Sequence, residues 1–432
     1  MSSSAPRTGT APHTGTALRA GTALRAGTAP HDLPEKAYAA ALASVPGVGP
    51  KTLRRLLEGS RPHAAWDELV TGSARVRAAL RTESAHKDAR KIDVAHVWAT
   101  HVQAGVGVCV LGEPGYPAAL RADPEAPAVL FSLGSPRVVD TAPRVAIVGT
   151  RSATRYGLGV AAQLGADLAA AGVVVVSGLA LGIDGAAHEG ALAAWRATSG
   201  REEPAADAAG ASLTAGPSGP EVRESFPTRR AAPPVAVVAG SVAAPYPRQH
   251  SGLWRRVAEA GAVLSEAPIG VADVAWRFPA RNRIIAALSD VVVVVECHSR
   301  GGSFHTVQAA TARSVPVGAV PGSVRSPASA GTNALLADGC FVVRDLSDVL
   351  VALGLSLAGA GPGRLPAQLS AQAADGLPSP TREVVGAVAW DRRSLEEILE
   401  QTGLPMDTVC GALERLRALG VVHGEAGWWE RC

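Results

Sequence analysis

Arginines beside aromatic rings give this sequence its clearest chemistry. The segment Trp276-Arg277-Phe278-Pro279-Ala280-Arg281-Asn282-Arg283 holds the densest basic cluster of the chain and leads into the apolar run Ile284–Leu288. Guanidinium groups bind phosphates and aromatic rings stack on bases, so this pattern is typical of a site for single-stranded nucleic acid. The alternative is a helix start with solvated arginines, which would give Asn282 and the two rings no purpose.

Glycine-rich polar turns form the second set of candidate binding residues. Glycine lets a backbone approach a phosphate closely, and a turn that opens a helix directs backbone N–H groups at an anion. In the third turn, Thr306 could add a hydroxyl. The turns are Gly149-Thr150-Arg151-Ser152, Ser177-Gly178-Leu179-Ala180-Leu181-Gly182 and Gly301-Gly302-Ser303.

A βαβ unit is predicted for Val145–Gly185, and it would position the first two turns. Val145–Val148 and Val173–Val176 are continuous branched runs, typical of strands buried on both faces, and an alanine-rich helix separates them. Both turns follow the carboxyl ends of these neighbouring strands, where open α/β sheets bind ligands. The absence of a GxGxxG fingerprint argues against a dinucleotide, so we expect Arg151 to hold a DNA backbone phosphate.

Asp184 begins a helix predicted for Gly185–Trp195 and admits more than one role. It could cap that helix, which is the commonest role of an aspartate there. It could also form a catalytic pair with His188, one turn further on. The simpler interpretation is that the two side chains tie the helix to the neighbouring loop.

Composition limits the class of protein. The 432 residues carry a net charge of only +3 and are 47% hydrophobic, so the chain is globular and any basic site must be local. The five cysteines are scattered and form no CxxC pair, which favours a reducing cytosol and no structural zinc. The sequence has neither the apolar core of a signal peptide nor a run long enough to span a bilayer. We therefore expect a cytoplasmic protein without membrane association.

Changes in composition predict the domain boundaries. We expect a disordered low-complexity tail over 1–31, a helical domain over 32–104, an α/β core with a parallel sheet over 105–350, a linker over 351–380 and a C-terminal domain over 381–432. Residues 197–234 are predicted to be a disordered insertion in the core. Further core strands are predicted at Val106–Leu111, Val129–Leu133, Val235–Ala239, Ala262–Ser265, Asp290–Glu296, Pro316–Val320 and Cys340–Val343, and Thr332-Asn333 is expected on a loop.

The N-terminal helical domain contains a pattern that resembles a helix-hairpin-helix. Residues 37–59 give helix, Pro46-Gly47-Val48-Gly49-Pro50, helix, with Lys51, Arg54 and Arg55 beside the turn. Such a hairpin can present backbone N–H groups to a DNA phosphate. A tight turn between two packing helices explains the pattern equally well.

The C-terminal domain reads as three helices followed by a hairpin, which predicts a winged helix. Its recognition-like helix, Asp407–Leu419, carries two arginines, Arg415 and Arg417, whose charge is balanced by Asp407 and Glu414. This is weak for reading a DNA groove, so contact with a protein partner is at least as compatible with the sequence.

Together these motifs resemble the DprA/Smf family, the DNA-processing proteins of natural transformation. The resemblance runs from about Tyr116 to Leu350, and eight motifs in the family's order make it specific. The motifs are Gly149–Ser152 with Tyr156-Gly157, Ser177–Asp184 with His188, Tyr246-Pro247, Ser265-Glu266, Phe278–Ile285, Gly302-Ser303, Pro321-Gly322 and Gly331-Thr332-Asn333.

The resemblance implies an extended Rossmann-like core between a SAM-like helical domain and a winged helix. It implies a homodimer that binds and protects incoming single-stranded DNA and loads the RecA recombinase, without catalytic residues, metal or cofactor. Carried over by position, the site comprises Gly149, Arg151, Ser152, Ser177, Gly178, Gly182, Asp184, Phe278, Arg281, Asn282, Arg283, Gly301, Gly302, Ser303 and Thr306. We expect the dimer surface to include the helix after Gly302 and the edge strand near Val342. The sequence departs from the family pattern at Gly240–Ala244 and Phe304-His305.

Two other function classes remain open. No GxxxxGK[ST] motif is present, and every lysine precedes the core. The glycine-rich sheet also resembles nucleotide phosphoribohydrolases, whose GGxGTxxE turn supplies a glutamate; Gly301–Gln308 matches half of that turn and lacks the glutamate. Without this carboxylate, nucleotide binding could persist while hydrolysis should not. A nucleotide sensor with an attached winged helix is the third possibility.

Overall fold

The structure is a computed structural model that describes residues 33–79, 84–199, 230–271, 274–299, 301–355, 379–388, 393–418, 421–425 and 427–431. The predicted tail and most of the predicted insertion and linker lie outside these residues. Within these ranges, no helix has both the length and the apolar character that crossing a bilayer requires.

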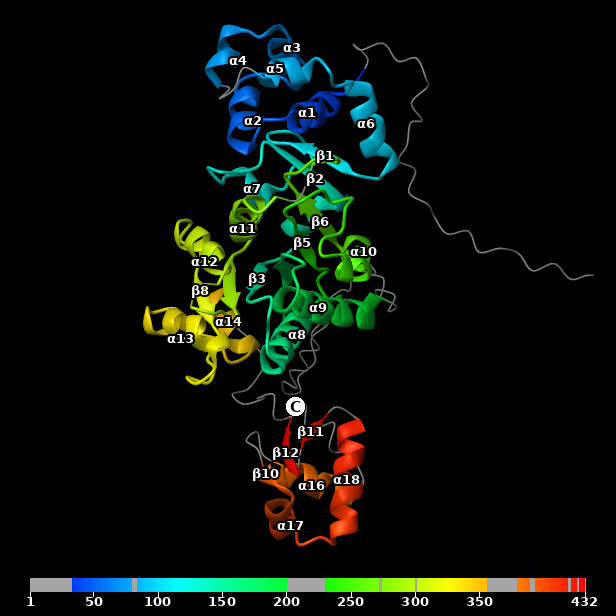
Figure 1. The fold of residues 1–432 in the computed structure, drawn as a ribbon, viewed down its shortest axis with the longest axis vertical. Coiled ribbons are helices and arrows are strands. Elements are labelled where there is room, and N and C mark those ends of the chain that lie inside the picture. Colours follow the sequence, from blue (N-terminus) through cyan, green and yellow to red (C-terminus); the bar gives the residue numbers. More distant parts are fainter. Residues whose placement is uncertain are drawn as a thin grey trace, which may run out of the picture.

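Short helices pack together ahead of the sheet, at the top of Figure 1. Pro50 begins the second of them, where the missing N–H needs no partner and the fixed φ suits a helix. Leu53 and Leu56 of this helix are buried in the same core as Leu42 of the first. The helices are α1 (Glu35–Ser44), α2 (Pro50–Leu57), α3 (Pro62–Thr71), α4 (Ala74–Ala79), α5 (Ser84–Ala89) and α6 (Val94–Gln103).

The central element is a sheet that, over the described residues, has nine strands in the order β1-β2-β6-β5-β4-β3-β7-β8-β9. Neighbours from β6 to β9 run parallel, whereas β1 and β2 join antiparallel at one side. Every strand predicted for the core is present. The strands are β1 (Gly107–Val110), β2 (Val129–Gly134), β3 (Arg144–Val148), β4 (Val174–Ser177), β5 (Val235–Val237), β6 (Ala262–Ser265), β7 (Val291–Val294), β8 (Val317–Ala319) and β9 (Phe341–Val342).

The strand order reverses at β3, and this reversal decides where a ligand could bind. From β3 the chain moves outward through β4, β5 and β6, then returns to place β7 on the other side of β3 and continues to β8 and β9. The loops after β3 and β7 therefore leave in opposite directions and open a crevice at the carboxyl end of the sheet. We call this place the switch point.

The sheet is buried on both faces by alternating side chains. Ala146 and Val148 of β3 belong to one apolar core, and Val145 and Ile147 belong to the core on the opposite face. This alternation follows from the two-residue period of a strand. Helices cover both faces, which explains why these strands read as continuous apolar runs.

The core helix predicted for Gly185–Trp195 is present as α9 and extends beyond both predicted ends. Glycine brings α8 and α9 into close contact, since a Cβ on Gly190 would lie 1.9 Å from the carbonyl oxygen of Ala162. The helices are α7 (Ala118–Arg121), α8 (Arg155–Ala170), α9 (Ile183–Ser199), α10 (Ser251–Ala260), α11 (Arg277–Ala287), α12 (Phe304–Thr311), α13 (Ala330–Ala337) and α14 (Leu346–Ala352), with 3-10 turns η2 (Pro136–Asp140), η3 (Arg248–His250) and η4 (Pro327–Ser329).

The loop predicted for Thr332-Asn333 is wrong, because both residues lie inside α13. The Asn333 side chain bonds the N–H and the carbonyl of Gly322 at 3.2 and 3.0 Å, which fixes the turn after β8. The polar character of Asn333 reflects this tertiary contact, and the Thr332 hydroxyl donates to the Ser329 carbonyl at 3.1 Å at the start of the helix.

The C-terminal residues form a small unit of their own. Ser394 and Glu397 make a reciprocal capping box at the start of its second helix. Val384, Ile398 and Leu413 form part of its apolar core. The elements are α16 (Ser379–Ala387), β10 (Arg393–Ser394), α17 (Leu395–Thr402), α18 (Met406–Ala418), β11 (Val422–Glu425) and β12 (Trp428–Arg431), with the strands in the order β10-β12-β11.

Candidate functional site

A cleft of about 350 Å³ opens at the switch point, between the loops that follow β3 and β7 and the first turns of α11. It brings together most of the predicted site residues from segments far apart in the chain. Those that line it are Gly149, Arg151, Asp184, Phe278, Arg281, Asn282, Gly301, Gly302, Ser303 and Thr306. We call it the switch-point cleft.

Arg151 lies at the mouth of this cleft on the exposed loop after β3. Its guanidinium carbon is 5.0 Å from the centre of the Phe278 ring, a cation–π geometry. Tyr246 packs beside Phe278, with its ring centre 5.6 Å from that of Phe278 and 47% of the residue exposed. It lines an adjoining pocket of about 70 Å³ that shares Arg151, Phe278 and Arg281 with the cleft. The mouth thus presents one cation and two aromatic rings to solvent.

Arg281 forms the floor of the cleft and is only 7% exposed. Its Nη1 donates to the carbonyl oxygens of Gly178, at 3.0 Å, and Val237. Burial lowers the pKa of Arg281 to about 10, which leaves it charged at neutral pH. Arg281 therefore connects α11 to the ends of β4 and β5.

Asp184 is the acidic partner of this floor and is 6% exposed. Its carboxylate accepts the Gly178 N–H at 3.1 Å and so ties α9 to the loop after β4, which confirms that prediction for Asp184. It is not the N-cap, because α9 begins at Ile183. Burial raises the pKa of Asp184, and Arg281 acts in the opposite direction. A Cβ on Gly178 would lie 2.5 Å from both Arg281 Nη1 and Asp184 Oδ2, so only glycine fits between them.

His188 is fully buried one turn along α9. Burial lowers its pKa to about 3, so the imidazole is neutral at physiological pH. It lies below the floor and does not line the switch-point cleft. This position favours a role in packing over a role in chemistry.

The two loops at β3 and β4 are fixed against each other by close backbone contact. A Cβ on Gly182, whose φ is +78°, would lie 2.4 Å from the carbonyl oxygen of Thr150. Leu179 is buried with a φ of +54°, an uncommon conformation for a side chain of this kind, and its carbonyl bonds His250 Nδ1 at 3.0 Å. Strained backbone of this sort is often found where a loop holds functional groups in place.

Glu296 supports the loop that carries Arg151, a role that the sequence analysis missed. It follows β7, is 1% exposed, and accepts the Thr154 N–H at 2.9 Å and the Thr154 hydroxyl at 2.5 Å. Thr154 is in turn the N-cap of α8 and accepts from Gly157. A carboxylate is favourable here because the N-terminus of a helix carries partial positive charge.

The turn before α12 closes the remaining wall of the cleft. Asn282 Nδ2 donates to the Gly302 carbonyl at 3.4 Å, which connects α11 to this turn. The hydroxyl of Ser303 donates to Cys297 Sγ at 2.9 Å, and Thr306 is buried. The Ser303 hydroxyl therefore shapes the turn, whereas Gly302 is exposed.

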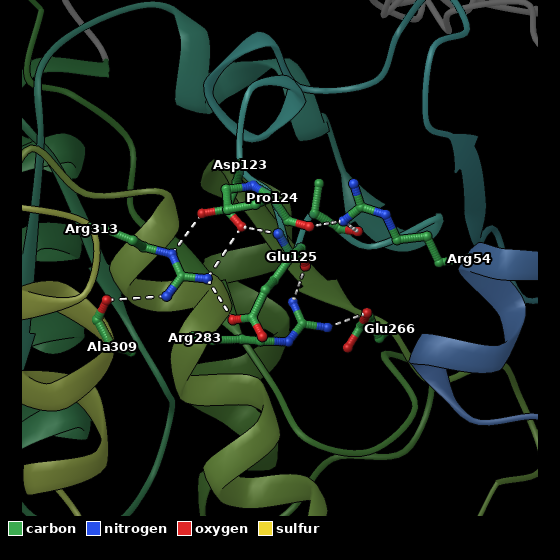
Figure 2. Close-up of polar contacts among 9 residues, drawn as sticks. Arg54, Asp123, Pro124, Glu125, Glu266, Arg283, Ala309 and Arg313 are labelled. Carbon is green, nitrogen blue, oxygen red and sulfur yellow. Dashed lines mark hydrogen bonds and ion pairs between the residues drawn. The ribbon is translucent and has the colours of Figure 1, made fainter. Parts of the chain in front are cut away.

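Arg283 lies outside the switch-point cleft, although it was expected beside Arg281. Two residues along a helix turn a side chain by about 200°, and Arg283 points to the opposite side of α11. There it pairs with Glu266 at 2.5 Å and donates to the Glu125 carbonyl at 2.7 Å, as Figure 2 shows. The alternative of a helix start with solvated arginines is therefore correct only in part. The cluster does begin a helix, α11. Arg281 and Arg283 are not solvated, because Arg281 is 7% exposed and the Arg283 side chain is 17% exposed.

Four other predicted residues lie on the site's loops without lining the cleft: Ser152, Ser177, Gly178 and Gly182. Ser177 is buried and donates to the Ile147 carbonyl at 2.6 Å. Ser152 is exposed next to Arg151, and Gly182 makes the close approach to Thr150. Thr150 and His305 also line the cleft, and Tyr246 lines the adjoining pocket. Thr150 belongs to the predicted binding turn Gly149–Ser152, whereas His305 and Tyr246 are not among the predicted site residues. The Tyr-Pro pair after Gly240–Ala244 was the available signal for Tyr246.

Known proteins match this chain over the same core. The family model described as DNA recombination-mediator protein A matches residues 107–200 and 226–354. The chain belongs to this family. The resemblance to DprA/Smf proteins drawn from the sequence motifs is thereby confirmed. The matched residues include the switch-point cleft and its supporting loops.

Individual relatives of the DprA family agree with this assignment. A Mycobacterium tuberculosis (strain H37Rv) protein named as a DNA processing protein DprA is 37% identical over 318 residues, which cover 72% of this chain and 71% of that protein. Protein Smf of Escherichia coli (strain K12) is 29% identical over 318 residues, which cover 73% of this chain and 75% of that protein. The X-ray structure of DprA from Streptococcus pneumoniae aligns with a TM-score of 0.57 and 25% identity, covering 74% of this chain and 98% of that one.

Proposed function

We propose that this chain binds single-stranded DNA in the switch-point cleft and acts as a recombination mediator without enzymatic chemistry. One observation carries the proposal: an exposed arginine, Arg151, lies over an aromatic ring, Phe278, at the mouth of a glycine-lined cleft. The arginine would hold a backbone phosphate and the rings of Phe278 and Tyr246 would stack bases. The names of the family and of its relatives, which refer to recombination and DNA processing, support the same function.

The cleft favours binding over hydrolysis. Asp184 is the carboxylate that lines it, and this group is almost fully buried, bonded to Gly178 and set against Arg281. A general base must reach the substrate with a free oxygen lone pair, which this position does not favour. The test for the alternative enzyme or sensor is incubation with AMP: release of adenine would support a phosphoribohydrolase, and tight AMP binding without cleavage would support a sensor.

Fluorescence anisotropy with labelled oligo(dT) tests the main proposal. We expect wild type to bind at low salt and Arg151→Ala to bind about tenfold or more weakly, because the lost contact is a phosphate contact near stacked bases. Arg137→Ala is the matched control, since Arg137 is also exposed but lies in η2, outside the cleft. Absence of binding by wild type, or equal binding by Arg151→Ala, would contradict the proposal.

The remaining parts of the proposal concern partners and flanking units. We infer that the protein is cytoplasmic, that α1 and α2 act as a helix-hairpin-helix, and that α16–α18 with the small sheet act as a winged helix. We also infer that it protects incoming DNA during transformation and loads RecA. Faster RecA filament formation on strands coated with single-strand-binding protein is the expected result; no effect of the protein on that rate would contradict it.

The dimer surface is expected at α12 and the edge strand β9. Strand β9 is the last strand at one side of the sheet, so its outer edge is open to pairing with a second copy. Val342 of this strand is 48% exposed. Cross-links between copies should therefore involve these two elements. Cross-links found only elsewhere would contradict this surface.

A further inference from the structure

A second and larger opening lies between the α1–α2 turn and the outer side of α11. Its volume is about 710 Å³, and Gly47, Gly49, Lys51, Arg55, Trp276 and Ala280 are among the residues that line it. We call it the hairpin groove. Helix α11 separates it from the switch-point cleft, because Phe278, Arg281 and Asn282 line the cleft while Trp276, Ala280 and Arg283 line the groove.

Most of the acidic side chains near the hairpin groove are already neutralised. Figure 2 shows Arg283 paired with Glu266, and Arg313 paired with both Asp123 and Glu125 at 2.6 and 2.9 Å. Arg54 of α2 donates to the Pro124 carbonyl, which holds the segment against the helical unit. The three guanidiniums of Arg54, Arg283 and Arg313 together match the three carboxylates, so the segment around Pro124 forms a wall with little net charge.

The cations that remain at this groove are Lys51 and Arg55, both exposed on α2. Glu58 is exposed on the same rim and offsets one of these charges. A Cβ built on Gly49 meets nothing within 4 Å, so the backbone of the hairpin also faces open space. Cationic side chains next to accessible backbone N–H groups are suited to phosphate.

Trp276 gives the hairpin groove an aromatic surface. It is 53% exposed, and the guanidinium carbon of Arg277 lies 4.8 Å from its ring centre. An exposed aromatic ring offers a face on which a base can stack, and such stacking is tolerant of sequence. A polypeptide ligand would not need the phosphate-binding groups that surround this ring.

We propose that the hairpin groove is a second contact for the same single strand, which crosses the N-terminal end of α11 from the switch-point cleft. Lys51 and Arg55 hold backbone phosphates there, and Trp276 stacks a base. This inference rests on the proposed function of the cleft. It assigns the hairpin of α1 and α2 to single-stranded DNA, in contrast to the duplex.

Oligonucleotides of two lengths distinguish binding at the cleft from binding at the hairpin groove. Oligo(dT) of about 6 nucleotides is short enough to occupy the cleft alone, whereas about 20 nucleotides can reach both sites. We expect Lys51→Ala/Arg55→Ala to weaken binding of the longer strand by about tenfold and to reduce its salt slope by about 1.4, the value for two phosphates. Trp276→Ala should weaken it by about fivefold or more. Binding of the short strand should change less than twofold in each case.

The matched control variants remove the same types of side chain at exposed positions outside the hairpin groove. Lys87→Ala/Arg137→Ala removes one exposed lysine and one exposed arginine outside the groove, and Trp428→Ala removes a tryptophan that is 47% exposed in the C-terminal unit. Each control should bind both strands like wild type. Equal weakening of short and long strands, or loss of duplex binding alone, would overturn the inference. Failure of wild type to bind either strand would instead contradict the proposed function of the cleft.

Discussion

The mouth and the floor of the switch-point cleft use the same side chain for different purposes. At the mouth, Arg151 is exposed and contacts the Phe278 ring. At the floor, Arg281 is 7% exposed and its Nη1 donates to the carbonyl oxygens of Gly178 and Val237. A guanidinium whose donors already bond the backbone has few left for a phosphate. The comparison teaches that burial, more than residue type, separates a ligand-binding arginine from a structural one.

Replacing the floor arginine should have the largest effect on stability. Arg281→Met removes the bonds to two carbonyls and leaves the Asp184 charge uncompensated in a buried position. Breaking such a buried arrangement by removing one partner costs about 3 kcal/mol or more of unfolding free energy. Urea denaturation followed by circular dichroism measures it.

The double variant Arg281→Met/Asp184→Asn is the control for this effect. It removes the stranded charge, so it should recover part of the lost stability. If Arg281→Met folds with wild-type stability but loses DNA binding, the floor is a ligand contact and the distinction between mouth and floor fails.

The sequence predicted the sheet well because its signals are local. Continuous valine runs such as Val173–Val176 and Val291–Val295 require burial on both faces, and polar glycine turns after strands mark the ligand edge. The association of Arg151 with Phe278 needed more than local pattern. The family resemblance places both residues in one site, and the contact between their side chains comes from the structure.

The errors concern contacts between residues that are distant along the chain. Glu296 binds Thr154 across 142 residues, and Arg283 bonds Glu125 across 158. Nothing in the sequence near Arg283 distinguishes it from Arg281, since only the helical rotation directs one to the cleft and the other to Glu266. The sequence predicts a loop at Asn333 because this polar side chain has no partner nearby in the chain; its partner, Gly322, belongs to the turn after β8.

Acid should destabilise the protein partly through the buried His188 below the floor. Its pKa falls to about 3 in the folded state, from 6.5, so below pH 6.5 the unfolded chain takes up a proton that the folded chain does not. The contribution to stability is complete above pH 6.5 and is lost as the pH falls towards 3. Between pH 7 and pH 4.5 this costs about 2–3 kcal/mol.

His188→Gln isolates this contribution from the other titrating groups. We expect the variant to lose about 2 kcal/mol less than wild type over the same pH interval, whatever its stability at pH 7. Urea titrations at both pH values give the difference. Identical losses would mean that the imidazole is protonated in the folded state, and the floor would then carry a further cation.

The support of the mouth loop should depend on Thr154 to a smaller degree. Thr154→Ala removes the N-cap of α8 and the hydroxyl that donates to Glu296. Loss of a cap of this kind costs about 1 kcal/mol. Thermal or urea unfolding measures this change, and Thr154→Ser, which keeps the hydroxyl, should restore most of the stability. If Thr154→Ala lowered the unfolding free energy as much as Arg281→Met does, the loop that carries Arg151 would be as important for stability as the floor, and the distinction between them would fail.

The smallest effect on stability is expected at the mouth itself. Arg151→Ala removes an exposed side chain whose contact with Phe278 is worth about 0.5 kcal/mol at such a site, so the unfolding free energy should hardly change. Binding of oligo(dT) by the same variant should fall about tenfold, as the proposed function requires. Arg151→Lys keeps the charge and should bind between the two, because an ammonium holds a phosphate but stacks less well on an aromatic ring. If Arg151→Ala instead destabilised the fold by as much as Arg281→Met, both arginines would be structural and the strand would have to bind elsewhere.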